Sequence, residues 1–204
     1  MSSSIYYHIA NSTGELDHLT DRFISAFHKA QKITEKELKA DCIDIIFINA
    51  PSLVIKELGI SGSSPGPHHM YVTVDSKFKN ITEENMILTI LHETHHCMRW
   101  RKPGYGKTLG EAMISEGLAT LYEEEHSGKV PIYAQVKIKQ SDIDLANKEL
   151  SNDKYDHQEW FFGSTKTPRW FSYSYGYKLA KEYSQKTNKK ASELVHTSAN
   201  LMLP

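Results

Sequence analysis

The apolar positions in the first part of the chain predict strands on either side of one helix. Residues 5–9 predict a short strand, and the run 43–48, rich in β-branched residues, predicts a largely buried one. Between them, residues 15–34 predict an amphipathic helix, because apolar side chains recur there at helical spacing: Leu16, Leu19, Phe23, Ile24 and Phe27. The Gly-, Ser- and Pro-rich stretch 59–67 predicts a loop, and residues 70–75 predict a further strand.

Helical patterns dominate the rest of the chain. One helix is expected from Asn80 or Thr82 to about Trp100, with acidic residues in its first turn. Thr108 and Glu111 form a capping-box pattern that predicts a helix to about residue 125, ended by Ser127-Gly128. The remaining expectations are irregular structure at 129–141, a helix at 142–150, a long connection at 153–169, a helix at 172–186 and a short one after Ala191.

This order of elements predicts an α+β fold. Strands come early and helices dominate later, so we expect a small N-terminal mixed sheet, then the helix that ends near Trp100, and a mainly helical C-terminal half. A chain of 204 residues fits a single domain. Within it, residues 1–79 form the sheet-rich part and residues 80–204 the helical part.

Composition restricts the partners and the compartment. The formal net charge is -1, so no nucleic-acid or anionic-membrane partner is expected. Only Cys42 and Cys97 are present, which is too few for a disulfide scaffold. The N-terminus lacks the pattern of a secretion signal, and no apolar run approaches the roughly 18 residues that would span a bilayer. We therefore expect a cytoplasmic protein.

Residues 92–96 read His-Glu-Thr-His-His and contain the H-E-x-x-H pattern in His92, Glu93 and His96. Two imidazoles four positions apart on a helix point the same way and can bind one Zn²⁺ ion. The alternative is two histidines and an acid on a solvated helix face. The strongly apolar run 86–91 argues against it, because it places the motif on a buried helix whose polar groups need partners.

Glu116 is the expected third ligand. It lies 20 positions after His96, a separation that suits a helix–turn–helix return of the chain. Gly117 and Ala119 are small enough to let two helices approach closely. Other acids of the same predicted helix lie near its ends, where acids are commonly solvated: Glu111, Glu123, Glu124 and Glu125. Cys97 is rotated about 100° from His96 on a helix, so a buried thiol is expected rather than a ligand.

These motifs resemble a known class. H-E-x-x-H followed by a glutamate in a later helix is the gluzincin arrangement of zinc metallopeptidases. More narrowly, residues 91–96, 112–119 and 168–170, followed by 173–177, are similar to the bacterial predicted zinc-dependent proteases of domain of unknown function 2268. The resemblance covers roughly residues 70–185. It implies one zinc ion per chain and a zincin-like peptidase fold.

The hypothesis for function is a zinc-dependent peptidase acting on peptides or proteins. A zinc-activated water would attack the peptide carbonyl, with Glu93 as general base. A further donor should stabilise the oxyanion. Tyr173 and Tyr177 are i,i+4 partners on one helix face, so they are the candidates, with Tyr173 first, whereas Tyr175 points elsewhere. Core packing is the alternative explanation for each of these tyrosines.

Other parts of the site are less defined by the sequence. The predicted strand Tyr71–Val74 is the expected edge for pairing with an extended substrate. His68 and His69 could line a cleft or be solvated, and residues 153–169 could form a cleft wall or simply pack on the body. The groups that orient the zinc-binding histidines remain open between Asp75, Asp156 and a backbone carbonyl.

Two other functions use the same residues. One is a zinc hydrolase of a non-peptide amide. The other is a catalytically inactive, zinc-stabilised binding protein, against which Glu93 argues, because a structural zinc site has no need of a base beside it.

Overall fold

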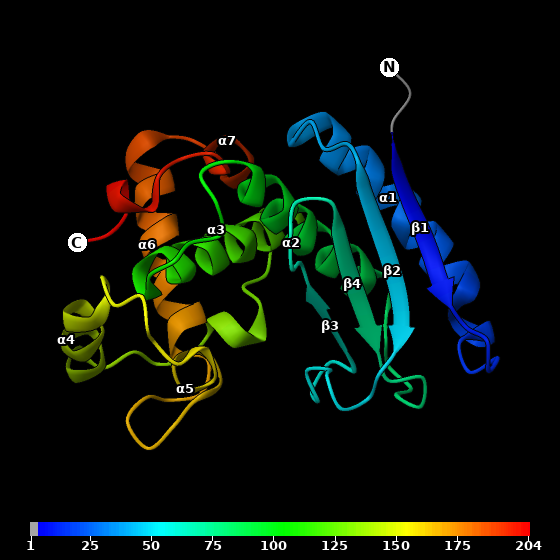
Figure 1. The fold of residues 1–204 in the computed structure, drawn as a ribbon, viewed down its shortest axis with the longest axis horizontal. Coiled ribbons are helices and arrows are strands. Elements are labelled where there is room, and N and C mark those ends of the chain that lie inside the picture. The colour runs from blue at the N-terminus through cyan, green and yellow to red at the C-terminus, as the bar shows by residue number, and fades with distance from the viewer. Residues whose placement is uncertain (1–3) are drawn as a thin grey trace. The chain divides into compact units, whose positions relative to one another are not determined.

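The computed structural model describes residues 4–204. By their contacts these divide into two compact units, one up to Met98 and the other Arg99–Pro204, and the division falls inside helix α2 (Glu83–Arg101). Figure 1 follows the chain through both units from blue to red. Each unit is described by itself below.

The first unit is built on a four-stranded sheet. The strand order is β1-β2-β4-β3, with β1, β2 and β4 parallel and β3 antiparallel to β4. Alternate residues of the parallel strands point to the same side of the sheet, and on one side these residues are apolar. The elements are β1 (Ile5–Ala10), a 3-10 turn (Asp17–Leu19), α1 (Thr20–Glu37), β2 (Ile43–Asn49), β3 (Ile60–Ser63) and β4 (His69–Val74).

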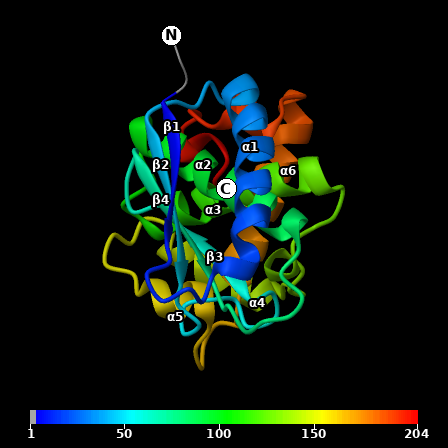
Figure 2. The same ribbon diagram turned by 90° about the vertical axis from the view of Figure 1, so that its right-hand side faces the viewer.

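Helix α1 covers the apolar face of the sheet, and the two views in Figures 1 and 2 agree on this placement. The ring of Phe23 stacks on Phe47 of β2 at 4.4 Å between centroids. The ring of Phe27 contacts Tyr7 of β1 at 4.8 Å. The amphipathic helix expected from the sequence is therefore confirmed, although α1 itself begins at Thr20 and the preceding residues form the 3-10 turn.

Helix α2 begins and ends close to the predicted positions. The Thr82 hydroxyl accepts the backbone N–H of Asn85 at 3.1 Å, and Glu83 and Glu84 lie in the first turn. These contacts satisfy a free N–H at the helix start and place negative charge at the positive end of the helix dipole. The segment that carries His92–His96 is thus a regular helix.

The second unit is helical. Its elements are α3 (Leu109–Ser127), a 3-10 turn (Ile132–Ala134), α4 (Gln140–Glu149), α5 (His157–Phe162), α6 (Phe171–Thr187), α7 (Ala191–Leu194) and a last 3-10 turn (Ala199–Leu201). The predicted capping box is present, because Thr108 accepts the Glu111 N–H and Glu111 accepts the Thr108 N–H. Gly128 ends α3 with φ of 69°, as its position in the sequence predicts.

Helices α3 and α6 cross at two glycines. A Cβ atom on Gly117 would lie 2.1 Å from the carbonyl oxygen of Gly176, and one on Gly176 would lie 2.0 Å from that of Met113. No side chain fits there, so both positions require glycine. Gly117 was expected to let α3 approach the helix that carries the histidines; the helix that it contacts closely is α6, so this expectation was wrong for Gly117.

Two sequence-based expectations were wrong. The predicted loop 59–67 contains strand β3, because backbone pairing with β4 does not require strand-favouring side chains. The predicted connection 153–169 contains the short helix α5, because Asp156 caps its first turn and Trp160 and Phe161 are buried in the core of the second unit. The α+β fold class, with a small mixed sheet followed by a helical half, is confirmed.

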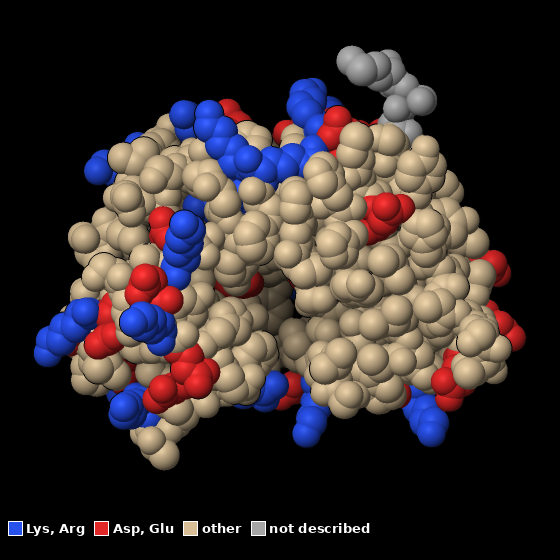
Figure 3. Space-filling model, viewed as in Figure 1, with Lys and Arg blue, Asp and Glu red and all other residues tan. Residues whose placement is uncertain are grey.

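Among residues 4–204, no helix is both long and apolar enough to cross a membrane. On the face seen in Figure 3, side chains of both charges are interspersed over the second unit, and the first unit is mostly uncharged. This distribution agrees with the small net charge of -1.

Candidate metal centre

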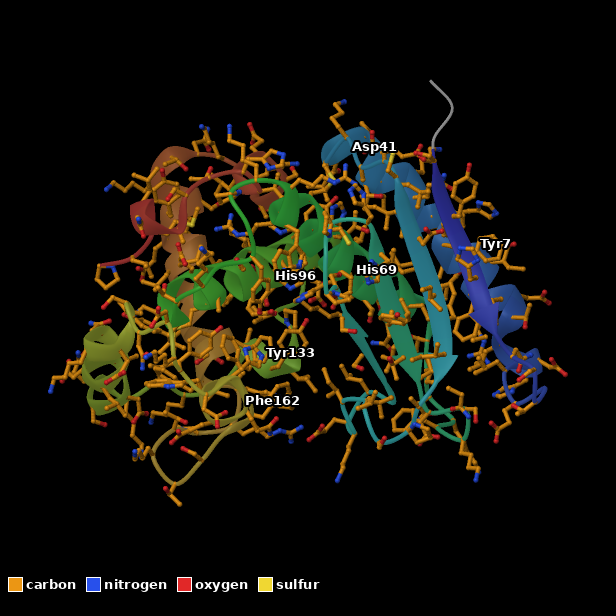
Figure 4. The ribbon with its side chains drawn as sticks, in the orientation of Figure 1. Tyr7, Asp41, His69, His96, Tyr133 and Phe162 are labelled. Atoms are coloured by element: carbon orange, nitrogen blue, oxygen red, sulfur yellow. The ribbon has the colours of Figure 1, made fainter. Side chains whose placement is uncertain are left out.

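Two imidazoles of helix α2 converge on one point. His92 and His96 are one helical turn apart, and their Nε2 atoms lie 2.9 Å from each other. Their rings are nearly perpendicular, with 4.6 Å between centroids. Both residues are buried, with exposed fractions of 8% and 4%; Figure 4 labels His96 on the helix. This is the geometry that the four-residue spacing predicts.

Glu116 of α3 joins these histidines. One potential ligand atom from each of His92, His96 and Glu116 lies within 4.8 Å of the others, and all three residues are buried. Two imidazole nitrogens and a carboxylate oxygen are ligands that zinc takes in proteins. The group could therefore hold a metal ion, and its donor chemistry fits zinc.

Glu93 is held by strand β3 and the residue after it. The Ser64 hydroxyl lies 2.7 Å from Glu93 Oε2 and 2.9 Å from the Glu93 carbonyl oxygen, so it can donate to either. Gly62 passes against the same side chain, since a Cβ atom there would lie 2.4 Å from Glu93 Cγ and Oε1. Neither contact was anticipated from the sequence, because both residues lie in the segment expected to be a loop.

Tyr105 is the partner of Glu116 within the second unit. Its hydroxyl donates to Glu116 Oε1 at 2.5 Å. Desolvation first, and then the negative charge of Glu116, raise the pKa of Tyr105 well above its usual range. The tyrosine is therefore a neutral donor at physiological pH. It lies in the turn between two helices, where no sequence pattern marks it.

The other acids of α3 are engaged elsewhere. Glu111 caps its own helix, and Glu124 accepts from Lys181 Nζ at 2.7 Å. Glu125 accepts the backbone N–H of Ala191 at 3.0 Å. Glu123 departs from the expectation of solvated acids, because it is only 6% exposed and accepts a hydrogen bond from the Tyr133 hydroxyl. Its position near the helix end is covered by the 3-10 turn that carries Tyr133.

The two candidate tyrosines of α6 lie in different surroundings. Tyr173 packs against the rings of Tyr133 and Phe161 at 5.3 and 5.2 Å. Electrostatic interaction with Tyr173 is a further cause of the raised pKa of Tyr105. Tyr177 instead donates to Glu124 at 2.6 Å.

The candidates for orienting the histidines, Asp75 and Asp156, and the loop residue His68 make hydrogen bonds to the backbone. Asp75 accepts the N–H of Lys77 at 2.9 Å, and Asp156 accepts that of Glu159 at 3.0 Å, so both shape the backbone near them. The exposed His68 donates through Nδ1 to the Cys42 carbonyl. Cys97 is fully buried, as expected.

The strand expected to pair with substrate is not at an edge. β4, which contains Tyr71–Val74, pairs with β2 on one side and β3 on the other. The edge next to β4 is β3, the strand hidden in the predicted loop. This correction brings the sheet edge beside Glu93, because Gly62 belongs to β3.

The chain belongs to the family described as predicted Zn-dependent protease (DUF2268), whose model matches residues 20–203. The family resemblance found in the sequence is thereby confirmed. No curated protein and no solved structure matches the chain.

Proposed function

We propose that the protein is a zinc-dependent peptidase with His92, His96 and Glu116 as metal ligands. The observation that carries the proposal is the convergence of these three buried side chains, with Glu93 beside the first histidine, in a chain of a family described as predicted Zn-dependent protease. The arrangement is that of a gluzincin. His92 and Glu116 belong to different units, so under this proposal residues 1–204 act as one functional domain.

Zinc, when bound, would lower the pKa of a water molecule toward about 7 and polarise the scissile carbonyl. Three protein ligands suit this chemistry better than four, because a catalytic site keeps one position for water or substrate. A structural site would normally take a fourth protein ligand.

Glu93 is the proposed general base. Its carboxylate would accept the proton of the attacking water and deliver it to the leaving amine. The Ser64 hydroxyl at 2.7 Å supports this role, because it restricts the carboxylate to one orientation. Gly62 supports it too, since its missing side chain is the space that Glu93 occupies.

Strand β3 is the proposed site for the substrate backbone. Beyond Ile60, which bridges to Ile55, no other strand among residues 4–204 pairs with its outer side. An extended peptide could add to this edge by main-chain hydrogen bonds. Because Gly62 of this strand contacts the Glu93 side chain, a peptide bound there would run past the base.

Tyr173 is the proposed oxyanion donor. The ring contacts of Tyr173 with Tyr133 and Phe161, at 5.3 and 5.2 Å, support this assignment because they hold the side chain in place. Tyr177 is the second candidate, and its hydrogen bond to Glu124 favours a role in holding α6 on α3. A donor aimed at the oxyanion is typically worth about a hundredfold or more in turnover.

Hydrolysis of a non-peptide amide is the second candidate function, because the same ligands and base would serve it. The sheet edge favours a peptide, since an extended backbone is what an unpaired strand binds.

The test is to measure zinc per chain by elemental analysis and to assay the zinc-loaded protein on a peptide library and on small non-peptide amides. The proposal expects about one zinc per chain and cleavage of peptides that stops when a chelator removes the metal and resumes when zinc is returned. Cleavage of small amides alone would favour the second candidate. Stoichiometric zinc without any turnover would point to a zinc-stabilised binding protein, and failure to bind zinc would contradict all three.

A further inference from the structure

We propose that Tyr105 is a positioning residue for the metal ligand Glu116, fixing the carboxylate in the orientation in which it binds zinc. The inference rests on the proposed function and adds one residue that holds a proposed ligand in place. Tyr105 would act through Glu116 and would not touch the metal or the substrate.

The contact itself is short and directional. The Tyr105 hydroxyl donates to Oε1 of Glu116 at 2.5 Å, the short end of the range for a hydroxyl and a carboxylate. A glutamate side chain has three rotatable bonds, and binding a metal through it requires that they be held. Carboxylates that bind metals are usually held by a hydrogen bond to one of their oxygens, and losing such a bond weakens metal binding.

Tyr105 is itself fixed at two points. Its ring stacks on Trp100 with 5.6 Å between centroids and 22° between planes. Its backbone carbonyl accepts a hydrogen bond from the hydroxyl of Ser115. The consecutive residues Ser115 and Glu116 of α3 therefore bind the two ends of the same tyrosine, so the position of its hydroxyl is set by the helix that carries the ligand.

A buried arginine completes the support. Arg99, with an exposed fraction of 1%, donates through Nε to the Ser115 oxygen at 2.7 Å. Its Nη1 donates to the carbonyl oxygens of Val195 and Thr197 at 3.1 and 2.9 Å. The guanidinium thus links Ser115 to the C-terminal segment, and Ser115 in turn binds the backbone carbonyl of Tyr105.

The neighbouring tyrosines have other partners. Tyr133 donates to Glu123, Tyr175 to Asn147 and Tyr177 to Glu124. Tyr105 is partly buried and Tyr175 is buried, and the Tyr175 hydroxyl likewise donates to a side chain, at 2.9 Å, so its loss is a control for the removal of one hydrogen-bonded tyrosine hydroxyl.

The experiment is to measure the zinc dissociation constant of the full chain by competition with a chelating dye, for wild type, Tyr105→Phe and Tyr175→Phe. We expect Tyr105→Phe to bind zinc about 10- to 100-fold more weakly, and Tyr175→Phe to bind it as wild type does. Melting temperatures of the zinc-free proteins separate this effect from general destabilisation, since only Tyr105→Phe should also show a smaller rise in melting temperature when zinc is added.

Equal affinities for wild type and Tyr105→Phe would overturn the inference and leave the proposed function standing. A wild type that binds zinc but cleaves nothing would contradict the peptidase proposal, and weaker binding by Tyr105→Phe would still support the positioning role. Should Tyr105→Phe fail to fold without zinc, Ser115→Ala loosens the same tyrosine from its carbonyl end. It should weaken zinc binding in the same direction, and unchanged affinity there would also overturn the inference.

Discussion

Helices α2 and α3 carry the candidate ligands in contrasting ways. On α2, two histidines and the proposed base lie within five consecutive positions of one helix. On α3, Glu116 is the single candidate ligand, and its two neighbours have structural roles: Ser115 donates to the carbonyl of Tyr105, and Gly117 lies on Gly176.

The two helices differ in what fixes the orientation of their candidate ligands. The position of a histidine pair follows from helix geometry alone, so α2 needs only to be a helix. The orientation of a lone glutamate depends on groups brought from elsewhere in the chain, which are Tyr105 and the residues that hold it. Changes around Glu116 should therefore act on metal affinity, whereas changes around Glu93 should act on turnover.

The largest expected effect is loss of the metal. His96→Ala should reduce zinc from about one per chain to nearly none, and Glu116→Gln should weaken binding strongly, because each removes one of three ligands. Elemental analysis after dialysis measures both. Glu123→Gln is the matched control, a second buried acid of α3, and should keep its zinc. Full occupancy in Glu116→Gln would show that another group is the third ligand.

Replacing each of the two tyrosines of α6 by phenylalanine should affect kcat differently. Tyr173→Phe should lower kcat by about 10²- to 10³-fold, the usual cost of an oxyanion donor. Tyr177→Phe should stay within about threefold of wild type in kcat and lose about 1.5 kcal/mol of unfolding free energy, because its hydroxyl donates to the Glu124 carboxylate. Steady-state kinetics and denaturant unfolding measure these effects. Wild-type kcat in Tyr173→Phe would remove it from the mechanism.

Gly62→Ala tests the contact between strand β3 and the base. The added methyl group would overlap Glu93 Cγ and Oε1, so the side chain must move. A shift of about 1 Å in a catalytic group can cost about a hundredfold in rate, and zinc content should be unchanged. The matched control is Gly66→Ala, where the nearest atom would be 3.8 Å away on His69. Equal kcat in the two variants would contradict the role of β3.

Ser64→Ala should have a smaller effect on kcat than Gly62→Ala. A hydrogen bond to a charged group is worth about 1.5–3 kcal/mol, and the lower value applies here, because the Ser64 hydroxyl is shared between the Glu93 carboxylate and its carbonyl. We therefore expect kcat to fall by about tenfold. Ser61→Ala is the control, since that hydroxyl donates to the Leu53 carbonyl. Unchanged kcat in Ser64→Ala would show that Glu93 needs no such partner.

Predictions from the sequence succeeded where the signal is local. The caps at Thr82 and Thr108, the stop at Gly128 and the apolar run of β2 all lie within the elements they define. Strand β3 was missed because its residues, Ile-Ser-Gly-Ser, become a strand only by pairing with β4.

The same reason explains what was missed at the site. Ser64 lies 29 positions from Glu93, and Tyr105 lies 11 positions from Glu116 in a turn with no regular pattern. Hydrogen bonds between residues so separated depend on the folded path of the chain, and no spacing rule predicts them. The candidate ligands could be proposed from the sequence because helix periodicity and donor chemistry are both local properties.

The most direct test of zinc-dependent hydrolysis with Glu93 as base is a paired measurement on zinc-loaded wild type and Glu93→Gln. Zinc per chain and turnover of the same cleaved peptide are measured on one preparation of each. We predict equal zinc, about one per chain, with turnover in Glu93→Gln reduced by about 10²- to 10⁴-fold, the usual contribution of a general base. Undiminished turnover in Glu93→Gln at full zinc occupancy would contradict the account.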